Sequence, residues 1–430
     1  MKYFLTQILI AATVINLVGK ELPAAGVWTQ WRGPERTGLV QGAFWPAKLD
    51  SLRLRQMWRM ELGEGYSGPI VSSNMVFTVE TLDKKREIVR AFDRLSGRQI
   101  WEHGWEGIMK VPFFSAKNGS WVRSTPAFDG ESLFVAGMRD FLVCFDASNG
   151  EVRWQVDFMN RFKSPLPKFG FVCSPLVVGD AVYVQAGASF VKLDKKTGTT
   201  VWRTLKDGGG MYGSAFSSPI YEKICGKEQL VVQTRKFLAG VDPDNGGVLW
   251  KQKVKAFRGM NIQTPVIIGD TLFTSCYGGA SILYKLKKGS EGFALTEVWR
   301  DKKSQGYMST PVVVEGKIYF HRRDQRFSCL DPEKKKILWR SPVHGLYCSM
   351  VSNGESVLAL NQKGELLLFD AIPERFNLRD RLKISKQATW GHLAVAGDQL
   401  FVRELKAITV YCWKEPSIFP ALEGILGQNN

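Results

Sequence analysis

The chain alternates apolar and polar residues over short segments, and turn-forming residues separate these segments. Val182-Tyr-Val-Gln and Lys317-Ile-Tyr-Phe are two examples, and each follows a turn that contains glycine. Alternation with a period of two residues is typical of β-strands that bury one face. The pattern therefore predicts an all-β protein built from many short strands.

A recurrent phrase shows how these strands are joined. An apolar strand runs into Asp, several turn formers and Gly, and a second strand then leads to Trp. Gly can adopt the positive φ of such a turn and Asp can cap its amides, so each phrase predicts a β-hairpin. Four copies are nearly intact and two are degenerate, and in chain order they end at Trp101, Trp154, Trp202, Trp250, Trp299 and Trp339.

The spacing of these tryptophans predicts the architecture. Counted from Trp58, they are separated by 43, 53, 48, 48, 49 and 40 residues, which is the period of a four-stranded propeller blade. A tryptophan has a large face to bury, so we expect all seven to dock on the neighbouring repeat and fasten one blade to the next.

A second series of motifs counts the blades. Ser, Thr or another small residue before Pro and an apolar run marks six starts, and two weaker copies continue the series. Pro is tolerated at the first residue of a strand, where its missing N–H needs no partner. The eight starts lie near residues 67, 124, 173, 217, 263, 309, 348 and 391.

The ends of the chain indicate how the ring closes. Only two further strands follow the last start, so the eighth blade lacks its outer strand, and the segment around Trp58 can supply it. We therefore predict one domain over residues 26–430, an eight-bladed β-propeller of four-stranded antiparallel blades closed by an N-terminal strand, with 414–430 as a loosely held tail.

Residues 1–25 resemble a secretory signal peptide. Lys2 precedes an apolar run from Tyr3 to Val18, and Leu22-Pro-Ala-Ala ends at a plausible cleavage site. An uncleaved N-terminal anchor is the alternative. In either case we expect an exported protein, either periplasmic or secreted.

Seven cysteines in such a chain leave at least one unpaired. Cys144 and Cys329 occupy the same strand position in blades far apart on the ring, so they cannot bridge one another. Small buried thiols are the expected use, with one disulfide between strands as the alternative. No Cys-x-x-Cys motif or pair of histidines indicates a metal site.

The repeated phrase at residues 91, 144, 192 and 240 resembles the tryptophan-docking repeat of the pyrroloquinoline-quinone-like (PQQ-like) eight-bladed propellers. The resemblance covers Trp28 to Trp413. That superfamily includes alcohol and glucose quinoproteins and the cofactor-free propeller of the outer-membrane assembly machinery. The opening Trp28-Thr-Gln-Trp-Arg-Gly-Pro is similar to exported members from planctomycete-like bacteria.

Resemblance to the quinoprotein dehydrogenases implies a calcium ion bound by Glu and Asn, an Asp base, a Trp under the quinone and a disulfide between adjacent cysteines. No two cysteines are adjacent in this chain. The three residues that end at each blade start, such as 65–67 and 122–124, are expected to line the central funnel; they include no carboxylate, and Glu64 lies just outside them. Neither PQQ nor calcium is therefore expected.

Aromatic and polar residues dominate these funnel positions. Aromatic faces with a few polar groups suit sugars or peptides, and the alternative is that these positions pack blade against blade while Ser or Thr before Pro satisfies turn amides. The candidate ligand-binding residues of the funnel are Tyr66, Arg123, Phe171, Phe216, Asn261, Gln263, Tyr307, Tyr347, Trp390 and His392.

Three connections between repeats, at residues 101–124, 154–173 and 202–217, are longer than the others. Long connections on one face often carry binding function in repeat proteins, although they could instead roof the channel. Their candidate residues include Trp105, Trp121, Lys163, Lys168 and Tyr212.

The charge of the chain narrows the choice of partner. It carries 58 Lys and Arg against 41 Asp and Glu, a net charge of +17, which favours polyanions or a membrane surface. Nucleic acid is excluded by the expected export. The sequence thus favours a non-catalytic propeller that binds an envelope protein or an acidic envelope polymer. A quinoprotein-type dehydrogenase and a carbohydrate-binding or carbohydrate-active propeller are the alternatives.

Overall fold

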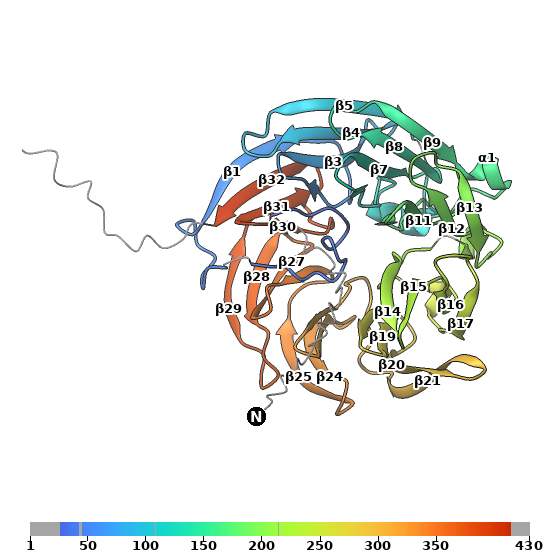
Figure 1. The fold of residues 1–430 in the computed structure, drawn as a ribbon. Helices are drawn as coiled ribbons and strands as arrows, with labels where there is room; N and C mark the ends of the chain where they lie inside the picture. Colours follow the sequence, from blue (N-terminus) through green and yellow to red (C-terminus); the bar gives the residue numbers. More distant parts are fainter. Residues whose placement is uncertain (1–25, 43–44, 108, 214, 414–430) are drawn as a thin grey trace, which may run out of the picture.

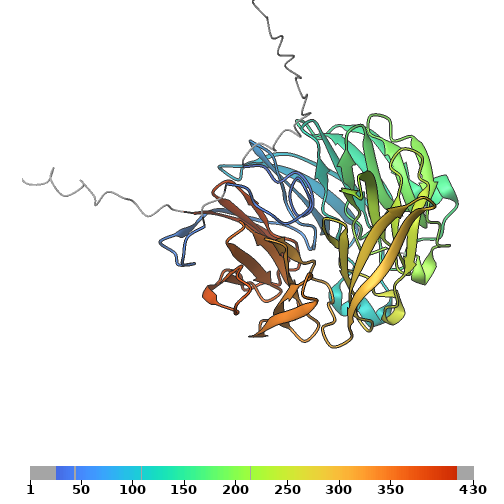
Figure 2. The same cartoon turned by 60° about the horizontal axis from the view of Figure 1, so that its bottom comes forward.

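The computed structural model describes residues 26–42, 45–107, 109–213 and 215–413. Within these residues the strands form eight four-stranded antiparallel sheets that stand side by side around one axis (Figure 1). The tilted view in Figure 2 shows the same ring of blades. The predicted all-β, eight-bladed propeller is confirmed, whereas the predicted signal segment and the tail lie outside the described residues.

The first four blades follow one another along the chain. Blade 1 contains β2 (Ile70–Val71), β3 (Met75–Leu82), β4 (Arg86–Asp93) and β5 (Gln99–Glu106). Blade 2 contains β6 (Ala127–Phe128), β7 (Ser132–Gly137), β8 (Phe141–Asp146) and β9 (Val152–Asp157). Blade 3 contains β10 (Leu176–Val178), β11 (Ala181–Ala186), β12 (Ser189–Asp194) and β13 (Thr200–Thr204). Blade 4 contains β14 (Ile220–Ile224), β15 (Lys227–Gln233), β16 (Phe237–Val241) and β17 (Val248–Lys253).

The remaining blades complete the ring. Blade 5 contains β18 (Val266–Ile268), β19 (Thr271–Ser275), β20 (Ser281–Gly289) and β21 (Gly292–Asp301). Blade 6 contains β22 (Val312–Val314), β23 (Lys317–His321), β24 (Arg326–Asp331) and β25 (Lys336–Val343). Blade 7 contains β26 (Cys348–Ser352), β27 (Ser356–Asn361), β28 (Glu365–Asp370) and β29 (Leu378–Lys383). Blade 8 contains β30 (Ala394–Ala396), β31 (Gln399–Glu404), β32 (Ala407–Trp413) and β1 (Leu54–Glu61).

The two faces of the ring carry different connections. On one face, the chain runs from the outermost strand of one blade to the innermost strand of the next. We call this face the upper face. These links hold the short helical turns, which are η1 (Phe113–Asn118), α1 (Phe158–Phe162), η2 (Gly210–Tyr212) and η3 (Phe257–Gly259). The lower face carries the turns between the first and second strands and between the third and fourth strands of each blade.

The N-terminal strand closes the ring as predicted. Strand β1 pairs antiparallel with β32, with Leu54 opposite Trp413 and Trp58 opposite Val410, and Figure 1 shows the blue strand beside the red one. The chain thereby covers the outer edge of blade 8, which would otherwise expose unpaired backbone groups.

The repeated phrase forms the turn between the third and fourth strands, and its tryptophan contacts the next blade. The indole N–H of Trp101 donates to the backbone oxygen of Ala147 at 2.9 Å. A Cβ atom on Gly150, whose φ is +79°, would lie 2.5 Å from the same indole. Glycine is therefore required at this turn both by its backbone conformation and by the approach of the ring. Corresponding indole bonds to the next blade are made by Trp58, Trp154, Trp202 and Trp339.

Two tryptophans depart from this arrangement. Trp250 donates to Oε1 of Gln229 in its own blade at 2.7 Å, and a Cβ atom on Gly240 would lie 2.1 Å from its indole nitrogen. Blade 5 has no Asp-to-Gly turn to receive Trp250, because β20 and β21 extend to a hairpin at Gly289 and Gly292. Trp299 is half-buried beside the core between blades 5 and 6.

The hydroxyl groups before the prolines connect the blades around the axis. The side chain of Thr125 accepts the backbone N–H of Gly68, and Ser174 accepts that of Thr125, each at 3.0 Å. Ser218, Thr264 and Thr310 continue the series to blade 6. These hydroxyls therefore satisfy backbone N–H groups between neighbouring blades.

The cores lie between neighbouring blades and contain most of the cysteines. All seven cysteines are free thiols, and five of them are buried. Burial raises the pKa of the Cys144 thiol to about 11, so this thiol remains protonated near neutral pH. Among the residues that the structure describes, no helix is long and apolar enough to cross a membrane.

Candidate functional site

The N-terminal segment 28–40, which we call the plug, enters the central channel from the lower face. Trp28 forms a bridge with Val71 of blade 1, and Leu39 forms one with Ser352 of blade 7. The side-chain amide of Gln30 exchanges two hydrogen bonds with the backbone of Val177 in blade 3. The plug therefore contacts blades on opposite sides of the ring, and Figure 1 shows it as a blue segment crossing the centre.

Two buried arginines hold the plug from within the channel. Arg32 donates to the backbone oxygens of Thr310 and Pro311, at 2.8 and 2.5 Å. Arg36 donates to Pro175 at 2.6 Å and to Ser174 at 3.2 Å. Burial lowers the pKa of Arg32 to about 9 and that of Arg36 to about 10, so both guanidinium groups stay charged near neutral pH.

A cavity of about 270 Å³ occupies the upper end of the channel, above Trp31 of the plug. The centre of the Trp31 ring lies 5.6 Å from the guanidinium of Arg32 and 5.4 Å from that of Arg36. Seven of the predicted funnel residues line this pocket, namely Tyr66, Arg123, Phe216, Tyr307, Tyr347, Trp390 and His392.

Three predicted funnel residues do not line the pocket, and their placement corrects the prediction. Phe171 is buried in the core between blades 2 and 3. The amide of Asn261 donates to the backbone oxygens of Arg235 and Val254. The amide of Gln263 donates to Ser309 in the next blade at 2.6 Å. These side chains turn away from the axis because they satisfy backbone groups or fill the interface between blades.

Stacked aromatic rings form one wall of the pocket. The rings of Trp390 and Tyr347 lie 5.3 Å apart with an interplanar angle of 18°. Tyr66 lies 6.0 Å from Trp390 and makes an edge contact with Trp121. Trp121 thus supports the pocket from behind Tyr66 rather than lining it.

Arg123 places a cation in the pocket wall. Its guanidinium lies 5.9 Å from the ring of Tyr66 and donates to the backbone oxygen of Gly119 at 2.5 Å. Its Nε atom is buried without a hydrogen-bond partner. Burial lowers the pKa of Arg123 from its usual value.

His392 lines the same pocket with a neutral imidazole. Its Nδ1 lies 2.9 Å from the backbone oxygen of Leu393, so Nδ1 carries the proton and Nε2 carries a lone pair. Burial, assisted by Arg32, lowers the pKa of His392 to about 3. The Nε2 atom has no hydrogen-bond partner in the described part of the chain.

The pocket offers none of the ligands of a quinone-type metal site. No carboxylate occurs among the described residues that line it, and no group of three or more His, Cys, Asp or Glu in the described ranges could hold a metal ion. Calcium sites need several oxygen ligands, commonly carboxylates. The donors of this pocket therefore do not fit calcium and its quinone.

An exposed aromatic and basic surface adjoins the pocket on the upper face, where Phe114 contacts Phe169 and Tyr277 contacts Tyr307. The side chain of Phe113 is 90% exposed and contacts Phe114. The guanidinium of Arg258 lies 6.0 Å from the ring of Phe114 and 5.2 Å from that of Phe257. We call the surface formed by Phe113, Phe114, Tyr212, Phe257, Arg258, Tyr277 and Arg323 the upper rim.

Sequence reasoning found part of the upper rim and missed the rest. Tyr212 was expected on a long connection, and it lies 48% exposed beside Arg235. Phe257 and Arg258 were missed because they lie on a shorter connection. Their adjacency in a polar segment, Lys-Ala-Phe-Arg-Gly, was the available signal.

The other predicted connection residues lie apart from the pocket. Lys163 is exposed at the end of α1, on the outside of the ring, and Lys168 is exposed on the same connection. Trp105 belongs to strand β5 rather than to a connection, and its indole donates to the buried carboxylate of Glu87 at 2.8 Å. Its expected position on a connection is therefore wrong.

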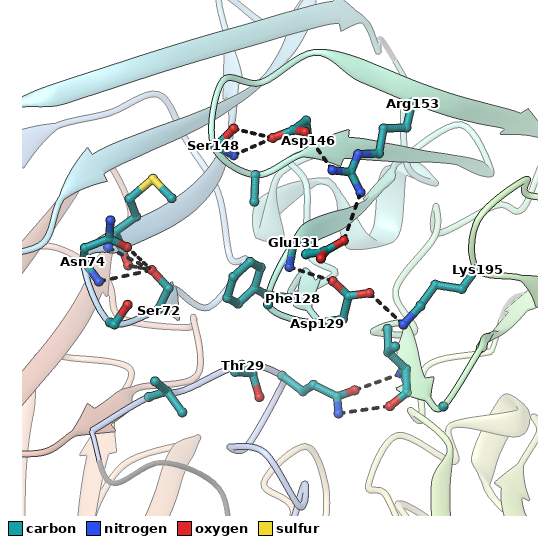
Figure 3. Close-up of a pocket in the computed structure, with 18 residues that line it drawn as sticks. Thr29, Ser72, Asn74, Phe128, Asp129, Glu131, Asp146, Ser148, Arg153 and Lys195 are labelled. Atoms are coloured by element: carbon teal, nitrogen blue, oxygen red, sulfur yellow. Dashed lines mark hydrogen bonds and ion pairs between the residues drawn. The ribbon is translucent and has the colours of Figure 1, made fainter.

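A larger depression of about 920 Å³ lies on the lower face, over blades 1 to 3 (Figure 3). Its charged side chains are paired: Asp129 with Lys195 at 3.0 Å and Asp146 with Arg153 at 2.7 Å. Asp146 also accepts hydrogen bonds from Ser148, which lower its pKa to about 2. These residues cap turns and neutralise one another, so this depression is a weaker candidate than the upper face.

Comparisons with known proteins agree with the fold. The family described as outer membrane protein assembly factor BamB matches residues 84–341. The BamB protein of Yersinia pestis is 22% identical over 276 residues, which cover 57% of this chain and 65% of the relative.

Two solved structures share the architecture at low sequence identity. The structure of BamB from Moraxella catarrhalis has a TM-score of 0.61 at 15% identity, covering 84% of this chain and 98% of its own. The quinohemoprotein alcohol dehydrogenase of Comamonas testosteroni has a TM-score of 0.60 at 11% identity, covering 92% of this chain and 82% of its own. At such identities both show the fold alone.

Proposed function

Since the chain belongs to the family of the outer membrane protein assembly factor BamB, we propose that it is a non-catalytic, exported propeller that binds a protein partner of the cell envelope. The relatives' names place them in outer-membrane assembly, which supports an envelope location for this chain. The proposal includes export through the segment 1–25.

The upper rim is the observation that carries this proposal. It exposes Phe113, Phe257 and Tyr212 beside the guanidinium groups of Arg258 and Arg323. Aromatic residues and arginine are the side chains most enriched at the energetic centres of protein interfaces. Large aromatic side chains gathered on one exposed surface commonly mark an interaction site.

The charge of the rim indicates the chemistry of the partner. Arg258 and Arg323 are exposed on it and form no ion pair with another described residue, and the whole chain carries a net charge of +17. Complementary charge steers association and selects partners. We therefore expect the partner to present apolar side chains surrounded by acidic ones, and an acidic polymer is an outcome that the experiment distinguishes.

The pocket chemistry supports the non-catalytic part of the proposal. A general base works best when its pKa lies near the working pH. His392 has a pKa of about 3, and none of the described residues around the pocket supplies a carboxylate. The side chains of the pocket therefore suit binding better than proton abstraction.

Site-specific photo-crosslinking in cells tests the proposal. A photoreactive amino acid at position 113 or 257 should give one discrete protein adduct, identified by mass spectrometry as an exported or outer-membrane protein. The same group at Leu52 or Leu95, which are 77% and 70% exposed away from the upper rim, is the matched control and should give no such adduct.

The yield of the adduct at position 113 should also fall in an Arg258→Ser background and at high salt, because both changes reduce the attraction between the upper rim and an acidic partner. Equal adducts at the rim and at the control positions would contradict docking through the upper rim. Adducts that disappear after removal of envelope polysaccharide would identify a polymer instead.

A further inference from the structure

The central pocket holds binding groups that docking on the upper rim does not use. Its volume of about 270 Å³ is below the usual range of 300 to 1,000 Å³ for pockets that take drug-sized ligands. A single substituted ring is therefore the size of molecule that it can enclose.

The first of these groups is a cation without an anionic partner. Within the described part of the chain, Arg123 bonds only the backbone oxygen of Gly119, and its buried Nε atom has no partner. Arg32 and Arg36, beside Trp31, likewise bond only backbone oxygens of described residues. Since no described lining residue is acidic, the pocket is positive and favours a carboxylate, which matches the planar donors of arginine.

The second group is an acceptor without a donor. The lone pair on Nε2 of His392 is buried and unpartnered, while its Nδ1 is already committed to the oxygen of Leu393. A buried polar atom without a hydrogen bond costs free energy. A ligand that carries a hydroxyl group would satisfy it.

The third group is a set of hydroxyl donors. The oxygen of each hydroxyl accepts a backbone N–H from the neighbouring blade. The proton of the same hydroxyl is therefore available to donate to a ligand oxygen. Among the described residues none of these hydroxyls donates to a partner. They are Thr125, Ser174, Ser218, Thr310 and Ser349.

Aromatic faces supply the remaining surface. Trp31, Tyr66 and Trp390 line the pocket and are each only half-buried. Flat aromatic surfaces favour the apolar face of a ring.

From these three groups and the aromatic walls we infer that the pocket binds a single-ring hydroxycarboxylate. Its carboxylate lies on Arg123, one ring hydroxyl donates to Nε2 of His392, and the ring contacts the aromatic wall. This site is separate from the upper rim, and its occupancy does not depend on a protein partner.

Calorimetric titration of the purified protein tests the inference with two pairs of probes. D-galacturonate is compared with D-galactose, which lacks the carboxylate, and 4-hydroxybenzoate is compared with benzoate, which lacks the hydroxyl. At least one hydroxycarboxylate should bind with a stoichiometry of one, and about tenfold more tightly than its partner in the pair. Which of the two binds identifies the ligand as a sugar acid or an aromatic acid.

Two variants assign the groups. Arg123→Gln should weaken binding of the hydroxycarboxylate by about tenfold or more, whereas Arg55→Gln, exposed on strand β1 away from the pocket and the upper rim, should leave it unchanged. His392→Leu should weaken binding of 4-hydroxybenzoate and bring its affinity to that of benzoate, which lacks the hydroxyl.

Three results would overturn the inference: no saturable binding of either hydroxycarboxylate, equal affinity for both members of each pair, or unchanged binding by Arg123→Gln. Should Arg123→Gln fail to fold, as judged by circular dichroism, the comparison of paired probes on the unmodified protein decides alone.

Discussion

At the scale of single residues, the repeated tryptophans differ in what they contact, and their energetic contributions should differ accordingly. Trp101 is 8% exposed and bonds the next blade through Ala147. Trp101→Ala should therefore lower the free energy of unfolding by about 3 to 5 kcal/mol, the usual cost of emptying a buried aromatic site. Urea denaturation followed by fluorescence measures this change.

Trp299 provides the matched comparison because it ends a degenerate copy of the phrase and is half-buried. Trp299→Ala should cost under about 2 kcal/mol, since much of the ring is already in contact with water. Equal losses at the two positions would contradict the distinction between interblade and peripheral tryptophans.

Two buried acids should make the stability of the fold depend on pH. Burial raises the pKa of Glu87, between blades 1 and 2, to about 7, and that of Asp140, between blades 2 and 3, to about 7. Both values exceed those of an unfolded chain, near 4. The folded state therefore binds these protons more tightly, so the contribution of the two acids to stability is greatest below about pH 4, declines as the pH rises from about 4 to about 7, and levels off above that.

The double variant Glu87→Gln and Asp140→Asn should flatten this decline. Each acid can lower the free energy of unfolding by up to about 1.4 kcal/mol per pH unit. Melting temperatures between pH 5 and pH 8 measure it. Asp146→Asn is the control, because the pKa of Asp146 is lowered to about 2 and its titration lies outside that range. A decline that persists unchanged in the double variant would show that other groups cause it.

Some residues could be placed from the sequence and others could not, for physical reasons. The docking position of Trp101 follows from a local hairpin phrase that is nearly invariant along the chain. Trp250 ends the same phrase, yet it turns onto its own blade, because the neighbouring blade lacks the turn and Gly240 leaves room for the ring. Phe171 was misplaced because one residue of register separates a side chain facing the axis from one in the core between blades.

At the scale of elements, residues 26–62 serve two purposes, as the plug and as the outer strand of blade 8. Deleting them should expose the edge of β32 and open the lower end of the channel. We expect the truncated protein to aggregate or to lose cooperative unfolding, as measured by light scattering and calorimetry. A truncated protein that stays monomeric and melts as before would contradict closure by this segment.

The double variant Arg32→Ala and Arg36→Ala separates the two purposes. It removes the guanidinium bonds to Thr310, Pro311, Ser174 and Pro175 while leaving β1 in place. We expect lower thermal stability with retained monomeric state, because the sheet edge remains covered.

The strands were more predictable than the segments that join them. Alternation, turns and repeat spacing are local signals, so the blades and the closing strand could be read from one sequence. The plug is held by contacts between residues far apart in the chain, such as Arg32 and Thr310, and no local pattern encodes them. Phe257 and Arg258 likewise join the upper rim only because the ring brings several connections together.

At the scale of the whole molecule, the absence of acidic side chains around the described pocket leads to a prediction about quinone chemistry. The purified protein should neither bind pyrroloquinoline quinone with calcium nor reduce an artificial electron acceptor in the presence of alcohols or sugars. Stoichiometric quinone binding together with dye reduction would contradict the non-catalytic proposal.

The most direct test of the central proposal is a calorimetric titration of this protein with the purified partner that crosslinking identifies. We predict saturable binding that weakens by about tenfold or more in the double variant Phe113→Ser and Phe257→Ser, since an aromatic residue at an interface centre contributes about 2 kcal/mol or more. The lower-face variant Leu95→Ser should bind as the unmodified protein does. Unchanged affinity in the double variant, with reduced affinity in Leu95→Ser, would contradict binding through the upper rim.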